Sequence, residues 1–144
     1  MRILGIDYGD ARVGIAITDA LGITAQGIET VHYEGNDRVL LKRLDEILQN
    51  YSDVEIIVVG MPINLKGERT VRAEVTEKFI HKLKCKYSKI KIDSIDERLT
   101  TVAAHKTMNF LQVNKKDKKN IVDTLSAVYI LETYLNKIKN ILQN

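Results

Sequence analysis

The sequence predicts an α/β protein with a five-stranded mixed sheet, an antiparallel meander plus parallel strands, flanked by helices. Three segments of β character, at 2–8, 13–19 and 24–33, follow one another through connections too short for a helix, which indicates antiparallel pairing. After residue 36, helical stripes alternate with short apolar runs, and this order favours crossover helices between parallel strands. The length of 144 residues suits one compact unit, so we expect residues 1–144 to form a single domain.

Turn-forming residues separate the three strands of the meander. Residues 9–12, with the sequence GDAR, divide the first strand from the second, and Leu21-Gly22 leads into the third. Such short connections join strands that lie side by side, so we expect the meander to follow chain order.

The later elements are predicted from the spacing of apolar residues. The first helix has an apolar stripe over 40–48, and either Asn36 or Asp37 can cap it. A strand over 54–59 is apolar almost throughout, which is typical of a strand buried on both faces. The remaining elements are a helix over 71–87, a strand over 90–96, a helix over 101–111 capped by Thr100, and a last helix over 121–138 capped by Asn120.

Composition limits the class of protein. A net charge of +3 permits a polyanionic partner without requiring one. The single cysteine, Cys85, excludes a disulfide framework and a cysteine-rich zinc site. The amino terminus reaches Asp7 too early for a secretory signal, and the longest clean apolar run, 56–59, is far too short to span a membrane. We therefore expect a cytoplasmic protein.

Lysines gather in two parts of the chain. Six lie between Lys78 and Lys91 with no carboxylate among them, and four more surround Asp117. Solvated helix and loop surfaces are one interpretation of these tracts, and contacts to nucleic-acid phosphates are the other. We predict that the second tract is a loop, and we expect it to matter more because it leads directly into the last helix.

Acidic residues are predicted to meet where the parallel strands end, since ligands of such sheets gather there. Asp7 lies near the end of the first strand among apolar residues, where a carboxylate is costly to bury unless it is paired or binds a cation. Asp96 and Glu97 lie where the predicted strand over 90–96 ends and the chain leaves it. Strand side chains alternate between faces, so only one of these two can point to Asp7, and the residues alone leave open which.

Asp123 is the third candidate acid. Near the start of the predicted last helix it could act simply through the helix dipole, and Asn120 with Asp123 resembles a capping box. Ser126 and Ala127 lie one turn further along, and small residues let a helix approach a sheet closely. We therefore expect the helix to carry Asp123 to the strand ends.

Three neighbouring carboxylates repel one another, and a hard divalent cation such as magnesium relieves that repulsion. Two such ions about 4 Å apart can activate water and stabilise the leaving oxygen of a phosphodiester. The acids and the lysines together predict a nuclease that uses magnesium or manganese. A non-catalytic nucleic-acid-binding module is the rival interpretation.

Four segments resemble the YqgF family, also called RuvX-like, of the ribonuclease H-like superfamily. They are GIDYGDARVGIAITD at 5–19, VVGMPINLKG at 58–67, DERLTT at 96–101 and KKNIVDTLSAVYIL at 118–131. Their order and spacing over nearly the whole chain make the resemblance specific. GIDYG also resembles the phosphate motif of actin-like ATPases and sugar kinases, but this chain is too short for the two domains of those proteins.

The resemblance implies a ribonuclease H-like fold and a cytoplasmic metal-dependent nuclease. The catalytic and metal-binding acids it implies are Asp7, Glu97 and Asp123. The residues expected to bind nucleic acid are Arg12, Asn64, Arg98, Lys115, Lys116, Lys118 and Lys119. Members of the family are assigned to maturation of the 5′ end of pre-16S ribosomal RNA, so a ribosomal RNA precursor is the favoured substrate. Holliday junction resolution, also proposed for the family, is the alternative.

A monomer is favoured over a dimer. A junction resolvase normally acts as a two-fold dimer with paired sites. The helix stripes over 40–48, 71–87 and 121–138 are all needed to cover the predicted sheet, which leaves no helix surface for such an interface. The sequence does not distinguish RNA from DNA, nor internal from terminal cleavage.

Overall fold

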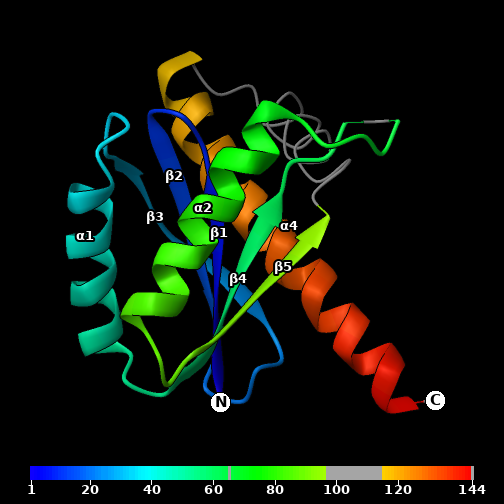
Figure 1. Cartoon of the computed structure of the whole chain (residues 1–144). Helices are drawn as coiled ribbons and strands as arrows, with labels where there is room; N and C mark the ends of the chain where they lie inside the picture. The colour runs from blue at the N-terminus through cyan, green and yellow to red at the C-terminus, as the bar shows by residue number, and fades with distance from the viewer. Residues whose placement is uncertain (65, 97–114, 144) are drawn as a thin grey trace.

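The computed structural model describes residues 1–64, 66–96 and 115–143, with the backbone alone described for 115–120 and 143. Five strands form one mixed sheet in the order β3-β2-β1-β4-β5 (Figure 1). The strands are β1 (Arg2–Tyr8), β2 (Arg12–Thr18), β3 (Ala25–His32), β4 (Val54–Met61) and β5 (Lys91–Asp96). β1 pairs antiparallel with β2, and β2 with β3, while β1 with β4 and β4 with β5 are parallel. The predicted meander and parallel strands are confirmed.

Helices cover both faces of the sheet. They are α1 (Asp37–Asn50), α2 (Val71–Lys86) and α4 (Lys115–Gln143). α1 and α2 pack on one face, and α4 crosses the other (Figure 1). The Asn36 side chain accepts a hydrogen bond from the Arg38 N–H, so Asn36 rather than Asp37 is the cap of α1. Thr70 caps α2 in the same way, by accepting from the Ala73 N–H.

Strand side chains alternate between two apolar cores. In β1, Leu4 and Ile6 face α1 and α2, whereas Ile3 faces α4. The first core contains Leu40, Leu44 and Ile47 of α1 and Phe79, Ile80 and Leu83 of α2, and the second contains Ala127, Ile130, Leu131 and Tyr134 of α4. This alternation fixes which strand residues can share a face with any given residue of α4.

The last helix begins earlier than predicted. α4 starts at Lys115, so Asn120 lies inside the helix and the predicted cap and capping box at Asn120 are wrong. The lysine tract from Lys115 to Lys119 likewise belongs to the first turns of α4 and not to a loop. Lysine is a good helix former, so the tract can extend the helix towards its amino end. The predicted helix over 101–111, with Thr100 as its cap, lies outside the described residues.

The carboxyl end of α4 extends past the sheet (Figure 1). Ile141 and Leu142 are exposed there, and the exposed Ile23 of the β2–β3 loop lines the same pocket as Leu142. The expectation of a monomer rested on the absence of a spare apolar helix surface, and that premise is wrong for this end of α4. The assembly state itself stays a prediction. None of the helices described for this chain is long and apolar enough to cross a membrane.

Candidate active site at the carboxyl ends of the parallel strands

Asp7 lies near the carboxyl end of β1, on the face that α4 covers. Its Cα partner in β2 is Gly14, and paired residues of neighbouring strands point to the same face. A side chain on Gly14 would project into the backbone of Asp123 in α4. β1 and α4 thus bring Asp7 and Asp123 together across Gly14, at the edge of the sheet where the parallel strands end.

Glycines let α4 lie directly on the sheet. A Cβ on Gly5 would come within 2.6 Å of a leucine side chain of α4, and a Cβ on Gly14 would overlap the carbonyl group of Asp123. A Cβ on Gly27 of β3 would overlap the methyl group of Thr124. These positions on β1, β2 and β3 form a track for the helix, which confirms the predicted close approach of the last helix to the sheet. Only glycine fits where the helix backbone itself is the neighbour.

Arg12, the first residue of β2, forms an ion pair with Asp123. The Arg12 Nε lies 3.0 Å from the Asp123 Oδ2, and the two side chains are 33% and 19% exposed, respectively. A guanidinium at this distance offsets part of the desolvation cost of the carboxylate. Arg12 was expected to bind nucleic acid. The structure gives it an acidic partner, and its contact to nucleic acid stays a prediction.

The last described residue of β5, Asp96, takes the face away from Asp7. Its Cα partner in β4 is Met61, which packs against the core on the α1 and α2 side. Ile92, of the same parity, belongs to that core, whereas Ile95 packs against the α4 core. Of the two neighbouring acids that the sequence left open, Asp96 is therefore the one that points away from the candidate site.

Two predicted site residues, Glu97 and Arg98, lie outside the described residues. Within the ranges 1–64, 66–96 and 115–143, no group of three histidine, cysteine, aspartate or glutamate side chains could hold a metal ion. The described part of the site thus supplies two of the three predicted acids.

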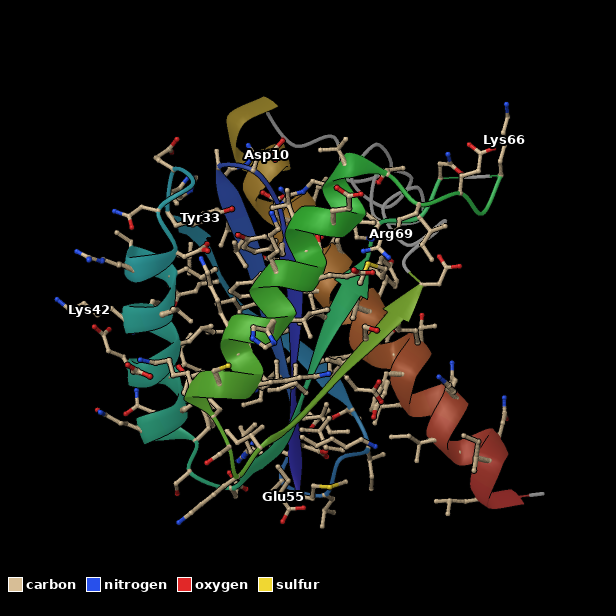
Figure 2. All side chains as sticks on the ribbon, in the orientation of Figure 1. Asp10, Tyr33, Lys42, Glu55, Lys66 and Arg69 are labelled. Atoms are coloured by element: carbon tan, nitrogen blue, oxygen red, sulfur yellow. The ribbon has the colours of Figure 1, made fainter. Side chains whose placement is uncertain are left out.

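Asn64 organises the turn that follows β4. Its Oδ1 accepts hydrogen bonds from the backbone N–H groups of Lys66, at 3.1 Å, and Glu68, at 2.8 Å. Figure 2 shows Lys66 at the same end of the molecule as Asp10 of the β1–β2 turn, whereas Glu55 lies at the opposite end. Asn64 therefore lies in a turn just after β4, at the end of the molecule where the parallel strands end. The structure gives its side chain a local role, and its predicted contact to nucleic acid is not tested.

The two lysine tracts lie on different elements of the fold. Three lysines of the 78–91 tract are engaged in ion pairs, namely Lys82 with Asp37, Lys86 with Asp45 and Lys91 with Asp93. These pairs place much of that tract in the layer of α1 and α2 and at the outer strand β5. The tract Lys115, Lys116, Lys118 and Lys119 opens α4, the helix that carries Asp123, and its side chains are not described.

Arg72 of α2 holds the β1–β2 turn and was not predicted. Its Nη1 lies 2.8 Å from the Asp10 Oδ1, its Nη2 donates to the Tyr8 carbonyl oxygen at 2.5 Å, and its guanidinium lies over the Tyr8 ring. Burial raises the pKa of the Tyr8 hydroxyl far above its ordinary value, with a further contribution from its hydrogen bond to Asp37. Tyr8 is thus a neutral structural residue directly after Asp7.

A pair of hydroxyl groups, which sequence reasoning also missed, lies in the same row of strand residues as Asp7 and Gly14. The Oγ1 atoms of Thr30 in β3 and Thr124 in α4 lie 2.8 Å apart. Thr30 is the Cα partner of Gly14, so Thr30, Gly14 and Asp7 form one row across three strands. A threonine in a strand and one in a helix give no signal in sequence, because their proximity depends on where α4 crosses the sheet.

Two groups of known proteins resemble this chain in fold or sequence. Among solved structures, RuvC of Thermus thermophilus superposes with a TM-score of 0.55 at 13% identity, over 96% of this chain and 97% of that one. The Fowlpox virus resolvase, solved in complex with Holliday junction DNA, superposes with a TM-score of 0.57 at 13% identity, over 96% and 99%. At this identity the likeness shows the fold, and it confirms the predicted ribonuclease H-like architecture.

Relatives by sequence are much closer. A protein of Ruminiclostridium cellulolyticum named "Putative pre-16S rRNA nuclease" is 51% identical over 96% of each chain. A protein of the same name from Acetivibrio thermocellus is 47% identical over 94% of this chain and 96% of its own length. The model of the family described as "RuvX: Holliday junction resolvase" matches residues 1–137. With that match over nearly its whole length, and with the resolvase fold beneath it, the chain belongs to the RuvX family.

Proposed function

We propose that this protein is a metal-dependent nuclease that hydrolyses phosphodiester bonds, with Asp7, Glu97 and Asp123 as its acids. The observation that carries the proposal is the meeting of Asp7 and Asp123 across Gly14 in a member of a nuclease family. A core or cap role explains neither residue well, since Asp7 is half-buried at a strand end and Asp123 is inside a helix that has already begun.

The described acids fit a divalent cation. Carboxylate oxygens are the ligands that magnesium and manganese prefer, and Asp7 and Asp123 reach the same place from two rigid elements. Because Asp96 points away, we assign the third position to Glu97. When bound, such a cation supplies Lewis-acid activation of the phosphodiester.

The protein's own residues position this site. The glycine track fixes the height of α4 above the sheet, and with it the position of Asp123. Arg12 holds the Asp123 carboxylate from the β2 side, and as a cation that is one-third exposed it can also attract a phosphate. The lysines at the start of α4 are proposed to contact the nucleic-acid backbone further along the strand, together with Arg98.

The favoured substrate is a precursor of the small-subunit ribosomal RNA. The close relatives are named for this RNA, and the two named here match this chain over 96% of their own lengths. A four-way DNA junction is the second candidate, favoured by the family description and by the fold shared with junction resolvases. A single nuclease domain over residues 1–144, acting in the cytoplasm, completes the proposal.

The choice between the two substrates can be tested directly. Purified protein with magnesium or manganese is offered a precursor of the small-subunit RNA that carries its 5′ extension, a four-way DNA junction and plain duplexes. We expect cleavage of the precursor and little cleavage of the junction. In the host, depletion should leave unprocessed 5′ extensions that the wild-type protein removes. Normal RNA ends together with accumulating recombination intermediates would reverse the ranking.

A further inference from the structure

One buried hydroxyl group of α4 has no hydrogen-bond partner. Ser126 lies three residues after Asp123 in α4, and only 1% of its surface is exposed. Within the described part of the chain its Oγ neither donates nor accepts a hydrogen bond. A buried hydroxyl keeps the full cost of its lost hydration unless a partner replaces the water, so such groups are rare in folded proteins. The Ser126 hydroxyl is therefore free to bind a partner from outside the chain.

Other hydroxyls inside the described helices do have partners. Thr76, buried in α2, donates to the carbonyl oxygen of Arg72, four residues earlier, at 2.9 Å. Thr133 of α4 donates in the same way to the carbonyl oxygen of Tyr129, at 2.7 Å. This intrahelical bond is a common one for a serine or threonine inside a helix. Ser126 does not form it, so the missing partner belongs to this position and is not general to helices of this protein.

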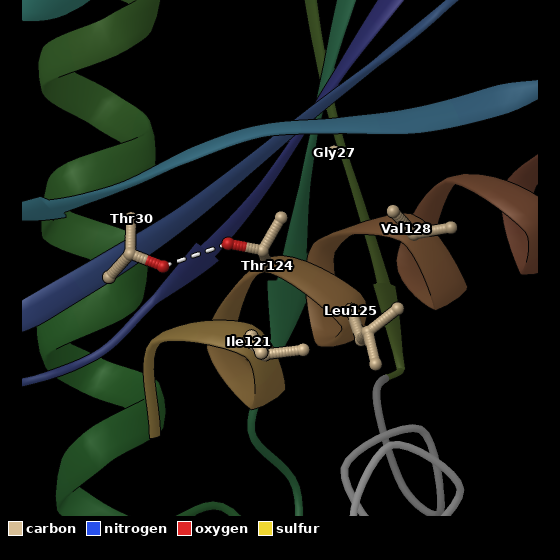
Figure 3. Close-up of a pocket in the computed structure, with 6 residues that line it drawn as sticks. All are labelled: Gly27, Thr30, Ile121, Thr124, Leu125 and Val128. Atoms are coloured by element: carbon tan, nitrogen blue, oxygen red, sulfur yellow. Dashed lines mark hydrogen bonds between the residues drawn. The ribbon is translucent and has the colours of Figure 1, made fainter. Parts of the chain in front are cut away.

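Ser126 lies on the side of α4 that faces β1 and β4. Thr124 and Val128 line a pocket beside β3, on the other side of the helix (Figure 3). Each of them is two residues from Ser126, and two residues correspond to about 200° around a helix, so Ser126 takes the opposite side. Ile130, one turn after Ser126, belongs to the same core as Val58 of β4. The Ser126 side chain is therefore directed away from β3.

The proposed acids are the nearest charged groups on that side. α4 lies on Gly14 of β2 through the backbone of Asp123, and on Gly5 of β1 one turn later. Ser126 belongs to the turn between these two contacts. Asp7 is the Cα partner of Gly14, and it follows Gly5 by two residues on the same face of β1. Asp7, Asp123 and Ser126 are thus neighbours at the place where α4 passes from β2 to β1.

The next strand supplies no side chain that could be the missing partner. The parallel register of β1 and β4 places Gly60 beside Asp7. The Cα partner of Gly60 in β5 is Ile95, which packs against the α4 core, so Gly60 is on the face that α4 covers. Glycine has no side chain to donate or accept. A partner for the Ser126 hydroxyl therefore has to come from what the acids bind.

We propose that the Ser126 hydroxyl positions a water molecule of the cation that Asp7 and Asp123 are proposed to bind. Magnesium keeps several of its water molecules when it has few protein ligands. A hydroxyl can accept a hydrogen bond from such a water and donate its own proton to a carboxylate oxygen. Groups that hold the surroundings of a metal site in this way raise its affinity without touching the ion. The inference rests on the proposed nuclease function and adds a positioning residue to it.

Removing the hydroxyl should have opposite effects in the two states of the protein. In the presence of a chelator the hydroxyl has no partner, so Ser126→Ala should keep or raise the thermal midpoint. Alanine is also the better helix former. With the cation bound, the same change removes a partner of the bound water and should weaken the binding of the cation. A purely structural role for Ser126 would not produce this combination.

The test measures metal binding, so it does not depend on turnover. Manganese is titrated into the full chain, and the free ion is followed by electron paramagnetic resonance. We expect Ser126→Ala to raise the dissociation constant of manganese about fivefold, the effect of one net hydrogen bond. Asp7→Asn should weaken binding more strongly. The matched control is Thr76→Val, which removes a buried helical hydroxyl on the other face of the sheet and should leave manganese binding unchanged.

Two results would overturn the role of Ser126. One is manganese binding by Ser126→Ala with the affinity of the wild type, and the other is a lower thermal midpoint of Ser126→Ala in chelator, which would reveal a partner inside the protein. Either result would leave the nuclease proposal intact as long as Asp7→Asn weakens manganese binding. If the wild type binds no manganese, or if Asp7→Asn binds it equally well, both proposals are contradicted.

Discussion

At the scale of single residues, the Arg12–Asp123 ion pair shows how the site can exist before any cation binds. Asp123 is only 19% exposed, and a carboxylate in that position requires a positive partner. Arg12 supplies it from the first residue of β2, directly after the turn that follows Asp7. The sequence identified both residues through motifs, but the pairing of a residue in the first tenth of the chain with one in the last fifth required the fold.

Tyr134 and Asp93 form a second side-chain contact of α4, at the outer strand β5. The Tyr134 hydroxyl donates to the Asp93 Oδ2 at 2.9 Å, and the Lys91 ammonium lies 3.9 Å from the same oxygen. Burial raises the pKa of Asp93, but the hydrogen bonds from the Ser94 N–H and Tyr134, together with the charges of Lys91 and Lys137, outweigh it, so the pKa lies below its usual value. Burial, with the bond to Asp93, raises the pKa of Tyr134 to about 12.

Replacing Tyr134 with phenylalanine should therefore lower the free energy of unfolding by about 1 kcal/mol at pH 7, a modest value because Asp93 is one-third exposed. A carboxyl whose pKa is depressed in the folded state stabilises the fold above its unfolded pKa, and that contribution is lost as the pH falls through the folded value. The difference between the two proteins should shrink as the pH falls below about 4. Urea denaturation at several pH values measures it, and a difference that does not change with pH would contradict the assignment.

At the scale of elements, the diagonal path of α4 is the central feature. The helix meets β3 through Thr124, β2 at Gly14, β1 at Gly5 and β5 through Tyr134. Glycine has a low propensity for strands, so Gly5, Gly14 and Gly27 weaken the strand prediction. In the structure these same glycines allow the helix to pack directly on the sheet. The sequence predicted close approach from Ser126 and Ala127, but it could not give the crossing point, because that depends on the register of three strands.

Gly14→Ala should destabilise the fold by about 3 kcal/mol, because its methyl group would overlap the carbonyl group of Asp123, which is backbone and cannot rotate away. Gly35→Ala is the matched comparison. Gly35 has a φ of +77° but only an ordinary contact at 3.7 Å, so its cost is backbone strain of about 1 kcal/mol. Thermal or urea unfolding of the two variants measures the loss in the free energy of unfolding for each. Equal losses would mean that α4 does not rest on Gly14 as described.

The start of α4 gives a second element-scale prediction. Replacing Lys115, Lys116, Lys118 and Lys119 with glutamine should weaken RNA binding for all sequences and flatten its dependence on salt, by about 0.7 in slope for each lost single-strand phosphate contact. The control replaces four exposed lysines elsewhere, Lys42, Lys78, Lys84 and Lys89, and so removes the same charge. If the α4 variant keeps the salt slope of the wild-type protein, the α4 tract is ordinary solvated surface.

At the scale of the whole molecule, the candidate site lies at one end of the sheet, where the parallel strands end. The carboxyl ends of β1 and β4 lie at one end with the β1–β2 turn and the Asn64 turn, and the start of β4 lies at the other (Figure 2). The antiparallel meander, the parallel pairing of the later strands and the presence of flanking helices followed from apolar periodicity and from connection length, which depend on local sequence. The start of α4 did not, because the lysine tract has the composition of an exposed loop and no apolar stripe to reveal a helix.

The face taken by Asp96 also required the structure. Period-two alternation predicts from sequence that Asp96 and Glu97 point to opposite faces, but the face that Asp96 takes depends on which residues of β5 pack against α4. The packing of Ile95 on the α4 core supplies that information and directs Asp96 to the other side.

The most direct test of the account is cleavage of the small-subunit RNA precursor by the wild-type protein and by Asp7→Asn in magnesium. Asp53→Asn, an exposed aspartate paired with Arg2 at the far end of β1, is the matched control. The account predicts that wild type and Asp53→Asn cleave, that a chelator stops both, and that Asp7→Asn loses cleavage by at least about a thousandfold with an unchanged thermal midpoint. Undiminished, metal-independent cleavage by Asp7→Asn, free of contaminating nuclease, would contradict it.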